Sequence, residues 1–296
     1  MTAALIDGKK IAEDIKREVK IETDKLKADQ GITPGLAFIL VGENPASQAY
    51  VRMKGKACEE MGFYSVTDRL PAETSQEQLL RLIDRFNRDP KIHGILVQLP
   101  LPKHISEEKV LTAIDYRKDV DGFHPINVGR LVIGQECLKP CTPLGVQELL
   151  MRSGNDPSGK HVVVVGRSNI VGKPVMNILL QKQKGANAVV TIAHTGAKDI
   201  SHYTKQADIV IAAMGRPECI TGTMLKPGAV VIDVGINRVE NAAAKNGYRL
   251  VGDVHFASAA EVASAITPVP GGVGPMTIAM LMRNTLRGAL GKIYLD

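Results

Sequence analysis

The sequence predicts an α/β protein of two domains, each a mostly parallel sheet with flanking helices, the second of them Rossmann-like. Short apolar runs alternate with longer segments of helical spacing, which is typical of parallel sheets covered on both faces. A chain of 296 residues is long enough for roughly two domains. The third observation is a strand, a glycine turn and a helix in succession over residues 162–180, an arrangement that binds dinucleotides.

The first domain begins with an amphipathic helix. We predict it over residues 9–29, because Ile11, Ile15, Val19 and Leu26 follow helical spacing and share one face. That face is expected to pack against a core.

Three strands and two helices follow in alternation. Asn44 is a suitable cap for the first of these helices, with Pro45 at its first position. Ser75 and Gln78 form a capping box that begins the second helix. The second helix has an apolar face made of Leu79, Leu80, Ile83 and Phe86. The strands are predicted at residues 36–41, 64–70 and 94–98.

A second α/β pattern begins after a linking helix that Thr142 caps and Pro143 starts. A final helix over residues 275–290 follows a segment dense in glycine and proline, where the chain is expected to cross back to the first domain. The expected domains are residues 1–141 plus 273–296, and residues 142–272. The strands of the second domain are predicted at residues 161–165, 188–193, 208–213, 229–234 and 250–254.

Composition narrows the classes of function. The formal net charge is +6, and no block of like charge stands out. Nucleic-acid binding is therefore unsupported, and the basic charge suits binding of anionic small molecules just as well as binding of nucleic acid. We expect no metal site, because the four cysteines form no C-x-x-C pair. The amino terminus lacks a signal-peptide pattern and no apolar run is long enough to span a bilayer, so we expect a cytoplasmic protein without membrane contact.

The strand at 162–165 ends in the turn Gly166–Pro174, which is expected to hold a pyrophosphate. Backbone N–H groups and a helix amino terminus face the phosphates in such turns. A triphosphatase loop is excluded, because five residues rather than four separate Gly166 from Gly172, and Pro174 stands where a magnesium-binding hydroxyl is needed.

The charges near this turn favour NADP over NAD. NAD enzymes usually place an acidic residue at the end of the second strand, whereas this strand ends at His194 and Thr195. Arg167 in the glycine turn offers a cation that can pair with a 2′-phosphate, although Arg167 as a solvated loop charge remains the alternative. No catalytic role is assigned to His194. Two later turns, 214–217 and 233–238, are expected to close over the nicotinamide half of the cofactor.

Tyr50 and Lys54 lie four residues apart on the helix that Asn44 caps. Residues at this spacing share one helix face, so a ring and an amine project together. Their helix follows the carboxyl end of a strand, where open α/β folds bind ligands. From spacing alone, a half-buried tyrosine beside a solvated lysine is the favoured interpretation.

Several motifs that occur in a particular order favour a functional role for Tyr50 and Lys54 instead. Together they resemble the bifunctional methylenetetrahydrofolate dehydrogenase/methenyltetrahydrofolate cyclohydrolase family, and the resemblance covers nearly the whole chain. A loop near Asn241–Tyr248 looks longer than in compact members. The motifs are residues 41–56, 97–102, 118–123, 140–145, 166–174 and 268–275.

The resemblance implies a reaction pair and roles for individual residues. NADP-linked oxidation of 5,10-methylene-tetrahydrofolate gives the 5,10-methenyl form, which water converts to 10-formyl-tetrahydrofolate. By resemblance, Lys54 is the central cyclohydrolase group, Gln98 hydrogen-bonds it, Tyr50 stacks on the folate, and Asp121 holds the pterin ring. Without the resemblance, Asp121 is a turn residue and Gln98 a polar group at a strand end.

The remaining implied contacts are to the cofactor and the folate. A homodimer and an active-site cleft between the domains are also implied. The cofactor-binding positions are Gly166, Arg167, Ser168, Thr195 and Ile236, and further substrate-binding positions are Leu99, Pro270, Gly271 and Gly272.

Two other functions stay open on the sequence. One is an NADP-dependent dehydrogenase of another small substrate, with the two-domain layout of an amino-acid dehydrogenase; it lacks support in the Gln98 and Asp121 motifs. The other is a non-catalytic nucleotide sensor, which has no need of a lysine set among a tyrosine, an amide and a carboxylate.

Overall fold

The computed structural model describes residues 2–241 and 247–294, and they divide into two compact units. The six-stranded unit comprises Met1–Glu13 and Thr142–Thr277, and the three-stranded unit comprises Asp14–Cys141 and Ile278–Asp296. Each is an α/β unit, as predicted. No helix among the described residues is both long and apolar enough to cross a membrane.

The six-stranded unit is built on a parallel sheet in the order β1-β11-β8-β7-β5-β6. The chain passes from β5 to β6 on one side and then returns to β7 on the other, so the strand order reverses at β5. Ligands of open α/β sheets bind at the carboxyl ends of the strands beside such a reversal. The strands are β1 (Ala4–Leu5), β5 (His161–Val165), β6 (Val189–Ala193), β7 (Ile209–Ala212), β8 (Val230–Asp233) and β11 (Ala265–Ile266).

Helices and turns connect these strands, and apolar side chains from some of the connections form a core with the sheet. The buried cluster includes Val163, Val210 and Val231 from neighbouring strands, packed with Leu225 and Ala259 from the connections. The connecting helices are α6 (Cys141–Arg152), α7 (Gly172–Leu179), α8 (Ser201–Thr204), a 3-10 turn η1 (Gly222–Met224) and α9 (Phe256–Ala260).

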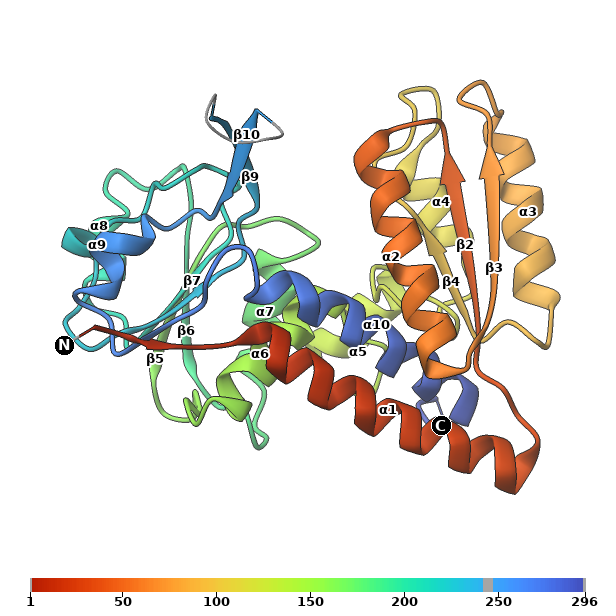
Figure 1. The fold of residues 1–296 in the computed structure, drawn as a ribbon, viewed down its shortest axis with the longest axis horizontal. Coiled ribbons are helices and arrows are strands. Elements are labelled where there is room, and N and C mark those ends of the chain that lie inside the picture. Colours follow the sequence, from red (N-terminus) through yellow and green to blue (C-terminus); the bar gives the residue numbers. More distant parts are fainter. Residues whose placement is uncertain (1, 242–246, 295–296) are drawn as a thin grey trace. The chain divides into compact units, whose positions relative to one another are not determined.

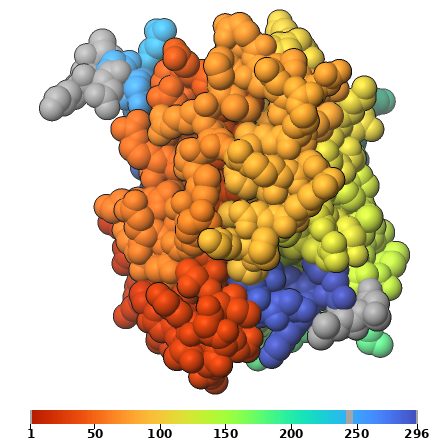
Figure 2. Space-filling model, turned by 90° about the vertical axis from the view of Figure 1, so that its right-hand side faces the viewer, coloured from red at the N-terminus to blue at the C-terminus, as the bar shows by residue number. Residues whose placement is uncertain are grey.

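The three-stranded unit has a parallel sheet in the order β3-β2-β4, with helices on both faces (Figure 1). All seven residues of β2 are buried, as expected for a central parallel strand. Ala37, Ile39 and Val41 face the helices α3 and α4, and α2 also packs against the sheet. Orange and yellow segments of this unit make up most of the surface in Figure 2. The elements are β2 (Gly35–Val41), α2 (Pro45–Met61), β3 (Tyr64–Leu70), α3 (Gln76–Arg88), β4 (Gly94–Val97), α4 (Glu107–Ala113) and α5 (Pro125–Val132).

Both predicted helix caps are present. The Asn44 side chain accepts hydrogen bonds from the backbone N–H groups of Ala46 and Ser47, and Pro45 is the first residue of α2. Ser75 and Gln78 make the reciprocal bonds of a capping box at the start of α3. Local sequence therefore determines where the helices on both sides of this sheet begin.

Two long helices belong to both units. Helix α1 (Gly8–Gln30) crosses the unit boundary after Glu13, and helix α10 (Val273–Leu290) crosses it after Thr277. The predicted division differs in two places, because residues 2–13 and residues 273–277 belong to the six-stranded unit. The reason at the beginning is tertiary: Ala4 and Leu5 of β1 pair with Ala265 and Ile266 of β11.

Three further details correct the sequence analysis. Helix α6 begins at Cys141, one residue before the expected cap. The strand expected at 250–254 is β10 (Tyr248–Val251), which pairs antiparallel with β9 (Asn237–Glu240) in a separate two-stranded sheet. Residues 242–246 of the loop predicted to be long lie outside the described residues.

Candidate active site and cofactor site

Lys54 lies on the buried side of α2. Its side chain is 8% exposed, and Ser47, Val51 and Cys58 are buried on the same helix. Tyr50, one turn earlier, is 41% exposed. The solvated lysine of the favoured interpretation from spacing alone is therefore wrong, and the aromatic ring rather than the amine is the accessible member of the pair.

The Lys54 amine is hydrogen-bonded to an uncharged amide. Its Nζ donates to Gln98 Oε1 over 3.1 Å. Gln98 follows directly after β4, and its Nε2 donates to the Leu99 carbonyl oxygen over 2.8 Å. Because that bond occupies the amide nitrogen, the amide oxygen faces the amine. Among the described residues, no ion pair joins Lys54 to a carboxylate.

Asp121 lies close enough to Lys54 to interact with its charge. The pKa of Asp121 is raised, because burial outweighs the charge of Lys54, which lowers it. The Cys141 thiol nearby donates to the Val120 carbonyl oxygen over 3.2 Å and stays protonated, because burial raises its pKa well above its usual value. Lys54, Gln98 and Asp121 all belong to the three-stranded unit.

A buried asparagine of α10 fixes the backbone beside Asp121. The Nδ2 of Asn284 donates to the carbonyl oxygens of Val120 and Lys139, both over 2.8 Å. The side chain is completely buried, and its Oδ1 has no partner among the described residues. Sequence reasoning missed Asn284; the signal was a polar residue among the apolar ones of the final helix.

This group combines a buried amine with a carboxylate. An amine can accept a proton from water and return it to a leaving nitrogen, provided that no ion pair holds it in the charged form. The Asp121 carboxylate can accept hydrogen bonds from the edge of a nitrogen-rich ring. The arrangement therefore suits proton transfer next to a group that offers hydrogen-bond donors.

The glycine turn after β5 lies where the strand order reverses. Gly166 has a φ of 133°, and a Cβ there would lie 2.1 Å from the Ala213 carbonyl oxygen after β7. A Cβ on Gly172 would lie 2.2 Å from the Gly166 carbonyl oxygen. Both glycines are therefore required by close backbone approach, and together they shape a turn open to a phosphate.

Ser168 organises the start of α7 within this turn. Its Oγ accepts hydrogen bonds from the backbone N–H groups of Val171 and Gly172, at 3.1 and 3.3 Å. The side chain thus acts as the cap that Val171 does not provide. Ser168 and Arg167 are both exposed.

Arg167 lies against the end of β6. Its Nη1 is 3.4 Å from His194 Nε2, while His194 Nδ1 accepts a hydrogen bond from the Gly196 N–H over 3.0 Å. The Arg167 guanidinium, which can only donate hydrogen bonds, thus lies beside the exposed Thr195. A guanidinium at this place suits a phosphate, and the turn with this cation fits a 2′-phosphorylated dinucleotide.

The other expected contact residues also lie in the six-stranded unit. Ile236, in the turn after β8, is 48% exposed. Pro270, Gly271 and Gly272 precede α10. A Cβ on Gly8 would lie 1.9 Å from the Gly272 carbonyl oxygen, so the chain is tightly packed there.

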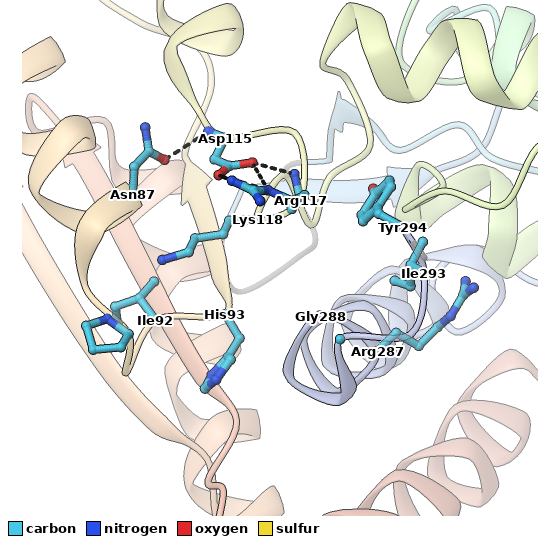
Figure 3. A pocket seen from close by; sticks show the side chains of 12 residues that line it. Asn87, Ile92, His93, Asp115, Arg117, Lys118, Arg287, Gly288, Ile293 and Tyr294 are labelled. Carbon is cyan, nitrogen blue, oxygen red and sulfur yellow. Dashed lines mark hydrogen bonds and ion pairs between the residues drawn. The ribbon is translucent and has the colours of Figure 1, made fainter. Parts of the chain in front are cut away.

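A separate pocket of about 460 Å³ lies at the amino edge of the three-stranded sheet (Figure 3). It is lined by charged residues, but its cations already have partners, and we assign it no ligand. Arg117 pairs with Asp115, Lys118 donates to the Phe86 and Asp89 carbonyl oxygens, and Arg287 pairs with Glu136.

Comparison with known proteins places both sites in one family. Residues 6–121 match the catalytic domain of tetrahydrofolate dehydrogenase/cyclohydrolase, and residues 140–292 match its NAD(P)-binding domain. The bifunctional protein FolD of Moorella thermoacetica is 62% identical over 289 residues, covering 98% of this chain and 99% of that protein. FolD of Syntrophobacter fumaroxidans is 58% identical over 288 residues, covering 97% of each.

Solved structures agree. The bifunctional FolD from Campylobacter jejuni has a TM-score of 0.92 at 49% identity, covering 98% of this chain and 99% of that one. The Trypanosoma brucei enzyme, solved with NADP and an inhibitor, has a TM-score of 0.93 at 42% identity, covering 99% of each. Shikimate dehydrogenase from Aquifex aeolicus, at a TM-score of 0.53 and 12% identity, shares the fold alone. On these matches over nearly its whole length, the chain belongs to the tetrahydrofolate dehydrogenase/cyclohydrolase family.

Proposed function

We propose that this enzyme oxidises 5,10-methylene-tetrahydrofolate to the 5,10-methenyl form with NADP, and then hydrolyses it to 10-formyl-tetrahydrofolate. The observation that carries the proposal is the buried Lys54 amine, hydrogen-bonded to the uncharged Gln98 amide. We further propose that the three-stranded unit with the carboxyl-terminal part of the chain binds folate, and that the six-stranded unit binds NADP.

Lys54 carries the protons of the hydrolytic step. Water attacks the methenyl carbon, and the amine takes the proton that the water loses. The bond from that carbon to N5 then breaks, the amine returns the proton to N5, and the formyl group stays on N10. Gln98 supports both stages, because an amide oxygen accepts a hydrogen bond from the amine without adding negative charge.

Tyr50 and Asp121 hold the substrate during both steps. The exposed Tyr50 ring offers a face on which the folate stacks. Asp121 accepts hydrogen bonds from the polar edge of the pterin, and Leu99 borders the same group through its carbonyl bond with Gln98. We place Pro270, Gly271 and Gly272 as further folate contacts.

The cofactor site uses the backbone more than the side chains. Gly166 and Ser168 shape the turn for the pyrophosphate, while Arg167, with Thr195 beside it, receives the 2′-phosphate. Ile236 offers an exposed apolar contact. Bound NADP supplies the hydride acceptor for the methylene carbon, and the protein's part is to hold donor and acceptor carbons close and aligned.

A homodimer and a cytoplasmic location complete the proposal. The homodimer comes from the family resemblance, and the location from the amino terminus without a signal-peptide pattern. The four cysteines support the location, since all are free thiols and free cysteines are typical of reducing compartments.

The test is Lys54→Gln, with Lys56→Gln as the matched control on the exposed side of the same helix. We expect Lys54→Gln to lower the cyclohydrolase rate by at least about 100-fold, because it removes the proton carrier, and to leave NADP binding intact. Lys56→Gln should change neither. The assay supplies methylene-tetrahydrofolate and NADP and follows the absorbance of the methenyl product and its decay. Undiminished decay in Lys54→Gln would remove Lys54 from the mechanism, and no methenyl signal in the wild type would contradict the proposed substrate.

A further inference from the structure

Two buried carboxylates lie outside the Lys54 group, in the six-stranded unit. Asp233 ends β8, and Asp253 follows β10; their exposed fractions are 4% and 0%. Neither has a role in the function proposed above. Buried carboxylates are costly unless their oxygens are fully hydrogen-bonded, so their partners indicate what they do.

Asp233 binds the backbone of its own turn and that of the segment carrying Asp253. Its Oδ1 accepts from the N–H groups of Gly235 and Asp253, and its Oδ2 from that of Val254, all over 2.9 Å. Gly252 is needed for this approach, because a Cβ there would lie 1.7 Å from Asp233 Oδ2. Asp233 thus anchors the strand end to the segment at 252–254.

Asp253 in turn binds the turn after β7. Three consecutive N–H groups, those of Met214, Gly215 and Arg216, donate to its carboxylate at 2.5, 2.9 and 3.0 Å. A fourth bond comes from Asn237 Nδ2 over 2.9 Å. Each carboxylate oxygen therefore accepts two hydrogen bonds, and one side chain joins the turn after β7 to the turn after β8.

These two turns lie at the carboxyl ends of the central strands, the edge where the fold binds its ligand. The exposed Ile236 lies between Gly235, held by Asp233, and Asn237, held by Asp253. The contact is close, because a Cβ on Gly235 would lie 2.3 Å from Asp253 Oδ1. Asp233 and Asp253 thus determine where the apolar side chain of this loop stands.

We propose that Asp253 is a positioning residue for the nicotinamide half of the cofactor: it holds the turns at 214–216 and 235–237 in the shape that seats the ring for hydride transfer. This inference rests on the proposed NADP site. Asp253 touches neither cofactor nor substrate in this role and acts through the two turns. The glycine turn at Gly166, which serves the phosphates, is held by different contacts.

The chemistry requires a carboxylate at this position. An ionised carboxylate only accepts hydrogen bonds, whereas an asparagine amide offers one oxygen and two N–H donors. In Asp253→Asn, the amide nitrogen would face two of the four donors that now converge on Asp253. The turns would shift away, although the side chain keeps nearly the same volume.

The experiment compares two ligands that differ by the nicotinamide. Wild type and Asp253→Asn are titrated with NADP and with 2′-phospho-ADP-ribose, which lacks the ring. We expect Asp253→Asn to weaken NADP binding at least tenfold and to change 2′-phospho-ADP-ribose binding by less than twofold. The dehydrogenase kcat should fall as well, because a misplaced ring is poorly aligned, while hydrolysis of methenyl-tetrahydrofolate without nucleotide stays unchanged.

Asp208→Asn is the matched control. Asp208 also accepts from a backbone N–H, that of His161, but at the amino edge of the same sheet. This variant should bind both NADP and 2′-phospho-ADP-ribose as the wild type does. Asn237→Ala removes one of the four bonds to Asp253 and should weaken NADP binding in the same direction by a smaller factor, so the proposal is tested even if Asp253→Asn does not fold.

Three outcomes decide the matter. Selective loss of NADP binding supports the positioning role. Equal loss of both ligands, or unchanged binding of both, overturns it while leaving the cofactor site in place. A wild-type protein that binds neither ligand contradicts the proposed NADP site itself.

Discussion

At the scale of single residues, the uncharged partner of Lys54 makes the sharpest prediction. In Gln98→Glu a carboxylate would replace the amide oxygen that lies 3.1 Å from the amine. The new negative charge favours the protonated amine, so the enzyme needs a higher pH to free its base. We expect the acid limb of the cyclohydrolase pH profile to move up by at least about one unit, with a lower rate at pH 7.

Gln98→Met is the control for this change. It removes the hydrogen bond without adding charge, so the rate should fall while the pH profile keeps its position. A Gln98→Glu profile that coincides with that of the wild type would mean that the amide does not govern proton exchange at Lys54.

The protonation of the buried Asp119 is expected to make the stability of the protein depend on pH. Burial raises its pKa from 3.8 to about 6, against hydrogen bonds from the His124 N–H and the Asn127 amide that lower it. The folded state therefore binds the proton more tightly than the unfolded chain. The contribution of protonated Asp119 to the free energy of unfolding is present in full below about pH 4 and is lost as the pH rises through about 6. The change amounts to at most about 3 kcal/mol.

Urea unfolding of wild type and Asp119→Asn at pH 4.5 and 7.5 measures this contribution. The stability of wild type relative to the variant should increase as the pH falls. Asp115→Asn is the opposite case, because hydrogen bonds and charge from Arg117 outweigh burial and lower the pKa of Asp115. The advantage of wild type over Asp115→Asn should stay nearly constant between pH 7.5 and 4.5 and shrink only below about pH 4. The same increase at pH 4.5 for both variants would contradict the assignment.

At the scale of elements, NADP binding and dehydrogenase activity are expected to depend on the turn between β5 and α7. In Gly166→Ala, the new Cβ would lie 2.1 Å from the Ala213 carbonyl oxygen, so the ends of β5 and β7 must separate. We expect NADP binding and dehydrogenase activity to fall at least about tenfold, since the backbone no longer fits the pyrophosphate. Hydrolysis of methenyl-tetrahydrofolate should remain.

Gly228→Ala separates steric contact from backbone strain. Gly228 also has a positive φ, 82°, but a Cβ there would meet nothing within 4 Å. Both variants place a side chain at a positive φ, which favours glycine, and only Gly166→Ala adds the clash with a carbonyl oxygen. Equal effects on NADP binding would show that the turn's shape is not what matters.

The elements that the sequence predicted well are those with local signals. The helix caps at Asn44 and Ser75 and the apolar strand β2 are each determined by residue types within a few positions of one another. Strand β1 has two exposed residues and exists because β11, some 260 positions later, pairs with it. No local pattern contains that information, and the β9–β10 hairpin was missed for a related reason, since its exposed alternation resembles a polar loop.

The same distinction applies to the candidate site. The Tyr50 and Lys54 spacing is local, but the burial of Lys54 and its bond to Gln98 depend on a strand 44 positions away. The ordered motifs supplied Gln98 and Asp121, whereas the carbonyl contacts of Asn284 and the four bonds to Asp253 come from pairings distant in sequence. Sequence motifs therefore identify the candidate reactive residues better than they identify the residues that hold those side chains and turns in position.

At the scale of the whole molecule, the course of the chain predicts cooperative unfolding. Helices α1 and α10 each contain residues of both units, so neither unit can unfold completely without losing part of a helix that the other contains. NADP at about 100 times its dissociation constant should stabilise the protein by about 2.7 kcal/mol. We expect hydrogen exchange to slow by about 100-fold not only in β5 but also in the fully buried β2 of the three-stranded unit.

Glu13→Pro tests whether α1 carries this coupling, because it interrupts the helix at the unit boundary at a cost of about 3 kcal/mol. The variant should keep NADP protection in β5 and lose much of it in β2, while Glu13→Ala should behave like the wild type. If β2 gains no protection from NADP even in the wild type, the two units open independently, and the continuous helices do not make the molecule one cooperative structure.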